Sequence, residues 1–97
     1  MLNKLIDNNI TTISFPAKLD TKAVSDFADE LKEIINSSEA IVYDMKDVGF
    51  VSSMFIRYCI SANNAENVNS FGLINVSPKI KLVFKISGLD VFVKDQQ

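Results

Sequence analysis

The sequence contains no histidine and only one cysteine among its 97 residues. Without histidine there is no imidazole to serve as a general base, to complete a Ser–His–Asp triad or to bind zinc. Cys59 alone can form neither an internal disulfide nor a thiolate metal cluster. A carboxylate metal site at Asp44 and Asp47 stays open, but the alternating acidic loop of an EF-hand is missing. We therefore predict a protein that is not an enzyme and that has no cofactor and no metal.

Basic residues are few as well. Ten Lys and Arg residues stand against twelve Asp and Glu residues, which gives a formal net charge of −2 and a pI near 4.9. Only one of the ten is Arg, and no cluster offers the basic stripe that phosphate contacts require, so we expect no nucleic-acid binding. No hydrophobic run approaches the ~20 residues of a membrane span, and the first residues do not resemble a signal peptide. We expect a cytoplasmic protein without membrane insertion.

The composition that remains is that of a globular domain. Hydrophobic residues make up 47% of the chain and charged residues 23%, close to the average of soluble proteins. A chain of this length buries roughly 65% of the surface that it exposes when unfolded, which is enough for a core. We predict a single domain over residues 1–97.

Hydrophobic periodicity predicts the helices. An amphipathic helix is expected over about 21–36, with Asp20 or Thr21 as the N-cap. Its predicted core residues recur at three-and-four spacing: Val24, Phe27, Ala28, Leu31, Ile34 and Ile35. A second helix over 54–62 is apolar on more than one side, which is typical of a largely buried helix and places Cys59 in the core. Ser77-Pro78 is a strong helix start, and Gly88 is a suitable residue to end that third helix.

Between these helices lie short runs typical of strands. Residues 2–6 and 10–15 predict a hairpin across the turn-prone residues 7–9, whereas 40–43, 71–76 and 89–93 predict three further strands. The expected order is β-β-α-β-α-β-α-β. Strands that alternate with helices favour an α/β fold, here a small, mixed and mostly parallel sheet flanked by helices.

Three segments resemble those of one family, the STAS domains of anti-sigma-factor antagonists. The run AIVYDMKDVGFVSS at 40–53 is similar to the central signature of that family, in which Asp-Ser-Ser-Gly-Leu-Gly opens a helix. The run VSPKIKLVFKISGLDVF at 76–92 resembles the C-terminal element, and AKLD at 17–20 resembles the family's Gly-x-Leu-Asp. The segments occur in the family's order, so the resemblance implies a STAS-like domain.

The resemblance also implies a function. Ser52 matches the serine that an anti-sigma factor, which is also a serine kinase, phosphorylates in the family, and Ser53 is the second choice. A phosphatase would then restore the unmodified protein. A phosphate before a helix adds about −1.5 to −2 charge, which can abolish docking without refolding. Ser-Ser before a helix can equally be only a cap, and either serine can fill that role.

Other residues are assigned by their place in the same motif. Those expected to contact a partner protein are Asp20, Val51, Ser53, Met54, Phe55, Arg57 and Tyr58. Asp20 has the alternative role of a helix cap, and Asp44 is expected to support the serine loop through hydrogen bonds to backbone N–H groups. The lysines at 79, 81 and 85 are expected on a solvated face.

The sequence departs from the motif at two positions beside the serines. Val51 stands where the family has Asp, and Met54 where it has Gly. The first change removes a polar group that a kinase can read, and the second adds a flexible apolar side chain. These changes favour an alternative function, a constitutive accessory or scaffold subunit of a lipid transporter or a signalling assembly, without phosphorylation.

Overall fold

The computed structural model describes residues 2–94. Its elements in chain order are β1 (Asn3–Asp7), β2 (Ile10–Ser14), β3 (Lys18–Leu19), α1 (Thr21–Asn36), β4 (Ala40–Asp44), β5 (Phe50–Val51), α2 (Ser53–Asn64), β6 (Ser70–Ile74), α3 (Pro78–Ile86) and the short 3₁₀ helix η1 (Asp90–Phe92). The main sheet has the order β1-β2-β4-β6. β1 is antiparallel to β2, whereas β2, β4 and β6 are parallel. The predicted mixed α/β fold is confirmed.

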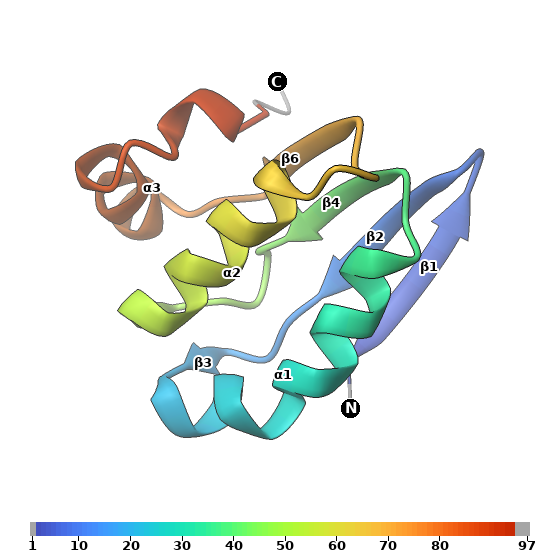
Figure 1. Cartoon of the computed structure of the whole chain (residues 1–97). Coiled ribbons are helices and arrows are strands. Elements are labelled where there is room, and N and C mark those ends of the chain that lie inside the picture. The colour runs from blue at the N-terminus through green and yellow to red at the C-terminus, as the bar shows by residue number, and fades with distance from the viewer. Residues whose placement is uncertain (1, 95–97) are drawn as a thin grey trace.

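Helices α1 and α2 lie side by side against one face of this sheet (Figure 1). Alternate strand residues face them and are buried, among them Ile13 in β2, Tyr43 in β4 and Leu73 in β6. The alternation follows from the period of two in a strand, which sends successive side chains to opposite faces. On the helix side, the predicted 21–36 boundaries agree with those of α1, and five of its six predicted core residues are buried; Ala28 is half-buried.

Aromatic rings form the centre of the core. The ring of Tyr43 lies edge-on to the rings of Phe15 and Phe71, with centroids 4.9 Å away in both cases. Phe55 from α2 closes the cluster against Phe15 at 5.0 Å. The hydroxyl of Tyr43 donates a hydrogen bond to the carbonyl of Tyr58 at 3.0 Å, which satisfies the one polar atom that this ring buries.

The C-terminal segment corrects the sequence prediction of a strand over 89–93. Gly88 has φ +79°, a left-handed conformation, and the N–H of Leu89 donates to the carbonyl of Phe84 at 2.8 Å. This arrangement is a Schellman ending of α3, and it turns the chain straight into η1. A single bridge between Val93 and Leu73 is all that is left of the expected strand.

The structure also contains two strands that the sequence analysis did not predict. β3 and β5 are two residues each and pair in parallel as a separate small sheet. Neither has the four or more alternating residues by which a strand is recognised in a sequence.

Two buried ionisable groups predict that the protein loses stability at alkaline pH. Burial raises the pKa of Cys59 above its ordinary value of 9.0. Burial is also the main reason that the pKa of Tyr43 lies above its ordinary value of 10.0, and the negative charges that Cys59 and Tyr58 would carry raise it further. Above those values the unfolded chain releases protons that the folded chain keeps. Stability therefore falls as pH rises, by about 1.4 kcal/mol per pH unit for each group.

We expect urea unfolding midpoints to fall from about pH 9 upward, whereas Cys59→Ala falls only from about pH 10. The native thiol is also expected to resist a thiol reagent until the protein unfolds. Identical pH profiles for the two proteins, or rapid labelling of the native thiol, would contradict the burial of Cys59.

Candidate functional site

The small β3–β5 sheet brings the starts of two helices together. Leu19 pairs with Val51, and the next residue on each strand, Asp20 and Ser52, is the N-cap of a helix. The N–H of Ser52 donates to the carbonyl of Leu19 at 2.9 Å, which continues the ladder. α1 and α2 therefore begin side by side at one end of the molecule. Their free N–H groups and the positive ends of their dipoles lie close together there.

Ser52, rather than Ser53, caps α2. Its backbone is extended (φ −101°, ψ 167°), and its Oγ accepts a hydrogen bond from the N–H of Phe55 at 3.3 Å. Its carbonyl accepts from the N–H of Ile56 at 3.2 Å, so both main-chain polar groups of Ser52 are held. The Ser52 side chain is half-buried, whereas Ser53 is exposed as the first residue of the helix. The alternative that the sequence left open is thereby resolved in favour of Ser52 as the cap.

Asp20 has the capping role at the start of α1. Its Oδ1 accepts from the N–H of Ala23 at 2.9 Å, and its other oxygen lies 3.9 Å from the ammonium of Lys18. The carboxylate keeps 40% of its side-chain surface exposed. It therefore caps the helix and still presents a negative charge at the surface beside Ser52.

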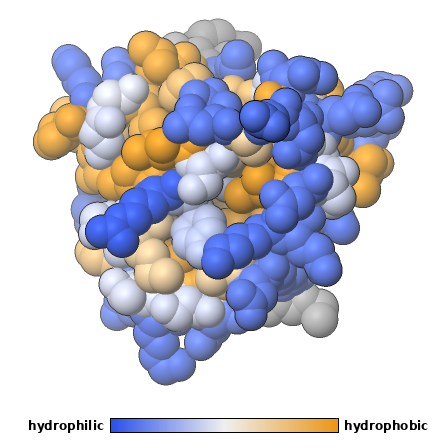
Figure 2. Space-filling view, viewed as in Figure 1, coloured by the Kyte–Doolittle hydropathy of each residue, from blue (hydrophilic) through white to orange (hydrophobic). Residues whose placement is uncertain are grey.

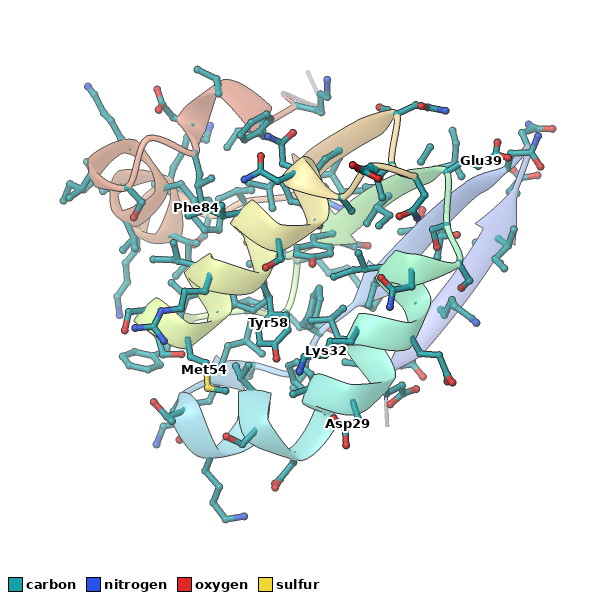
Figure 3. The ribbon with its side chains drawn as sticks, viewed as in Figure 1. Asp29, Lys32, Glu39, Met54, Tyr58 and Phe84 are labelled. Atoms are coloured by element: carbon teal, nitrogen blue, oxygen red, sulfur yellow. The ribbon has the colours of Figure 1, made fainter. Side chains whose placement is uncertain are left out.

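Met54 and Tyr58 lie in the seam between α1 and α2 (Figure 3). Both are half-buried and pack against the core, as Val51 does. The hydroxyl of Ser25 in α1 donates to the sulfur of Met54 at 3.8 Å. Sequence reasoning assigned no role to Ser25, because the register between two helices depends on tertiary packing. Met54 consequently ties the first turn of α2 to α1 instead of standing free on the surface.

Two expectations about partner contacts are changed. Phe55 is fully buried in the aromatic cluster, so it supports the site from below and cannot touch a partner. Phe50, which was not among the expected contacts, is 46% exposed in β5, two residues before Ser52. An aromatic residue two positions before the serines was the sequence signal for Phe50 as a contact residue. It was missed because the two-residue strand that contains it is too short to be predicted from sequence. Arg57 is exposed, as a contact residue must be.

Asp44 accepts a hydrogen bond from one backbone N–H in the segment that leads to the serines, but none from the serines themselves. Its Oδ1 accepts from the N–H of Lys46 at 3.1 Å and from the side-chain amide of Asn75 at 2.9 Å. The bond from Asn75 joins the end of β4 to the residue after β6, where Asn75 adopts a positive φ of 57°. Asp44 thus stabilises the neighbouring loop rather than the residues around Ser52.

Within residues 2–94, no group of three or more acidic or cysteine side chains is arranged to hold a metal ion. None of the helices in this range is long and apolar enough to cross a membrane. The site consists of two capped helix ends, an exposed phenylalanine and a half-buried serine whose hydroxyl caps α2. Such an arrangement can bind another protein and can accommodate an anion.

No family model matches the chain, and no curated protein matches it. Solved structures do. The anti-sigma factor antagonist SpoIIAA in its unphosphorylated form superposes with a TM-score of 0.83 at 19% identity, covering 100% of this chain and 89% of that one. The Bacillus cell fate determinant SpoIIAA in the phosphorylated form gives 0.74 at 18% identity, with 100% and 92% covered.

A third solved structure agrees with these two. An anti-sigma-factor antagonist (STAS) domain protein from Planctomyces limnophilus has a TM-score of 0.83 at 21% identity, covering 99% of this chain and 88% of its own. The likeness spans the four-stranded sheet and the three α-helices of the present structure. The chain therefore has the fold of the anti-sigma-factor antagonist, or STAS, domains.

Proposed function

We propose that the protein is a regulatory protein-binding module that acts as an anti-sigma factor antagonist and changes partner when Ser52 is phosphorylated. The observation that carries the proposal is the position of the half-buried Ser52, the N-cap of α2, where the starts of α1 and α2 meet. The proposed partners are an anti-sigma factor with serine kinase activity and a phosphatase that reverses the modification. The module itself is proposed not to be an enzyme and to act in the cytoplasm.

The proposed contact surface surrounds Ser52. Phe50 supplies an exposed aromatic anchor, Asp20 and Ser53 supply polar groups, and Arg57 adds a cation on the exposed side of α2. An exposed aromatic side chain surrounded by polar residues is a common composition for a transient interface. Val51, Met54 and Tyr58 shape this surface from the half-buried seam.

Phosphorylation would act through charge rather than through refolding. A phosphate on the N-cap residue lies where backbone N–H groups and the helix dipole favour an anion, so the folded state tolerates it. For the partner the effect is opposite: about −1.5 to −2 of charge is added beside the Asp20 carboxylate on a protein of formal charge −2. SpoIIAA, solved in unphosphorylated and phosphorylated forms, supports the comparison.

The first prediction separates binding from stability at Ser52. Ser52→Ala loses the cap and about 1 kcal/mol of stability, whereas Asp is a good cap and keeps stability within about 0.5 kcal/mol. Binding to the anti-sigma factor that co-purifies with the protein is expected in the reverse order: Ser52→Ala retains it and Ser52→Asp loses it. Urea unfolding and titration calorimetry measure the two orders independently.

Ser53→Asp, one residue further on and exposed, is the matched control for the added charge and should weaken binding less. Equal binding by Ser52→Ala and Ser52→Asp would refute the switch. If phosphosite mapping by mass spectrometry also finds no phosphate on residue 52 in protein from its native host, the alternative function, a constitutive accessory or scaffold subunit, is favoured.

A second prediction tests the aromatic anchor. Phe50→Ala is expected to weaken partner binding by about tenfold, because exposed aromatic residues at interfaces contribute disproportionately to affinity. Its effect on unfolding should be small because 46% of the residue is already exposed. Ile60→Ala, an apolar residue of α2 with 42% exposure, is the matched control. Equal losses of affinity in both variants would remove Phe50 from the interface.

A third prediction concerns Met54. Met54→Ala should lower stability by about 1 kcal/mol through lost packing in the seam, and Met54→Gly by about 2 kcal/mol, because Gly adds about 1 kcal/mol of helix cost. Unfolding midpoints give both values.

Phosphate uptake at Ser52 from the co-purified kinase is measured on the same variants. Greater uptake by Met54→Gly identifies the size of the Met54 side chain as the obstacle to the kinase. A gain confined to Val51→Asp assigns it to the missing carboxylate, and a stabilised Met54→Gly would mean that residue 54 is not helical in solution.

A further inference from the structure

The charge of the protein is distributed unevenly along the chain. Residues 76–97, which include α3 and η1, contain four lysines and two aspartates, a net charge of +2. Residues 1–75 contain six basic and ten acidic residues, a net charge of −4. The C-terminal segment therefore carries a net positive charge on an acidic protein. A surface of one sign steers partners of the opposite sign toward it.

The same segment exposes large hydrophobic side chains. Leu82 is 63% exposed, Ile86 87% and Val91 74%, three of the eight large hydrophobic residues that the described chain exposes. Figure 2, viewed as in Figure 1, shows hydrophobic atoms gathered on the side where α3 lies, interleaved with hydrophilic ones. Burial of these side chains on α3 is not needed for the fold, since Ile80 and Phe84 already dock the helix on the core.

The basic and apolar side chains form two adjacent rows along α3. Lys81 and Lys85 are four residues apart, and so are Leu82 and Ile86, so each pair lies along the same face of the helix. An open groove of about 500 Å³ lies over these rows, lined by Pro78, Lys81, Leu82, Lys85 and Asp90. Its volume falls in the range that holds a side chain or a small ligand. Its two lysines outnumber its one carboxylate.

We propose that this groove, together with Ile86 and Val91, is a second docking surface whose occupant is an acidic polypeptide segment of a partner protein. One large apolar side chain of that segment would enter the groove over Leu82, and neighbouring carboxylates would face Lys85. A concave groove suits a protruding side chain better than it suits the flat surface of a bilayer, which favours a peptide over an anionic membrane.

The surface is separate from the one around Ser52. α3 contacts η1, and η1 contacts the β6 edge, whereas the seam beside Ser52 is formed by α1 and α2 (Figure 1). The acidic face of α1 in a second copy of this chain is a poorer occupant. The acidic face of α1, with Asp26, Asp29 and Glu33, exposes no large hydrophobic side chain to fill the groove. The groove and the surface around Ser52 share no residue.

The test selects the occupant without assuming its identity. A random peptide library displayed on phage is panned on the protein, after depletion on a Leu82→Ser, Lys85→Glu double variant. The enriched peptides are expected to be acidic and to contain large aliphatic or aromatic residues. The best of them, as a synthetic peptide, should bind about tenfold more weakly to each single variant and more weakly as salt rises.

Matched controls lie elsewhere on the surface. Leu5→Ser replaces a leucine with 67% exposure on β1, and Lys32→Glu reverses an exposed lysine of α1. Both should leave peptide binding unchanged, and all four variants should keep their unfolding midpoints, which shows that the groove variants are folded.

Three results would overturn the proposal. They are the absence of peptides that prefer the protein over the double variant, enrichment of neutral or basic peptides, or equal losses in the control variants. Co-sedimentation with phosphatidylserine-containing vesicles that depends on Leu82 and Lys85, without any peptide selection, would identify a membrane surface instead. Concentration-dependent self-association abolished by Lys85→Glu would identify a second copy.

Discussion

The parallel pairing of β3 with β5 is the contact on which the candidate site depends. Only two residues from each strand take part, yet the ladder places the N-cap of α1 next to the N-cap of α2. Each cap then satisfies backbone N–H groups at its own helix end, through Asp20 and Ser52. Without this pairing the two helix starts would be held together only by packing between α1 and α2, and the Asp20 carboxylate and the Ser52 hydroxyl would lose their backbone link.

The rigidity of this end of the molecule has a second source in the aromatic core. Phe55 reaches from the first turn of α2 into the cluster around Tyr43, and Met54 in the same turn crosses to Ser25. One turn of helix is thus anchored both beneath and beside the surface on which Ser52 lies. Modification of such a site can change the charge seen by a partner while the backbone stays in place, which is the physical basis of the proposed switch.

Much of the fold could be predicted because its signals are local. The three-and-four spacing of apolar residues marks α1, and Ser77-Pro78 marks the start of α3. Alternation and β-branched residues mark the strands of the main sheet. The C-terminal strand was predicted wrongly because Leu89–Val93 has strand-like composition, but the Schellman ending after Gly88 turns the chain before a strand can form. The strand propensity of residues 89–93 was overridden there by the geometry at the end of α3.

For the site, the sequence by itself determined which residues lie next to the second helix and that two serines begin it. The net positive charge of the C-terminal segment can also be counted directly in the sequence. Only the tertiary structure decided that Ser52 is the cap, that Phe55 is internal and that Phe50 is exposed. These outcomes depend on contacts between residues far apart in the chain, such as the Ser52 N–H with the Leu19 carbonyl. A local pattern contains no information on such pairs, because the free energy that selects them comes from packing the whole core.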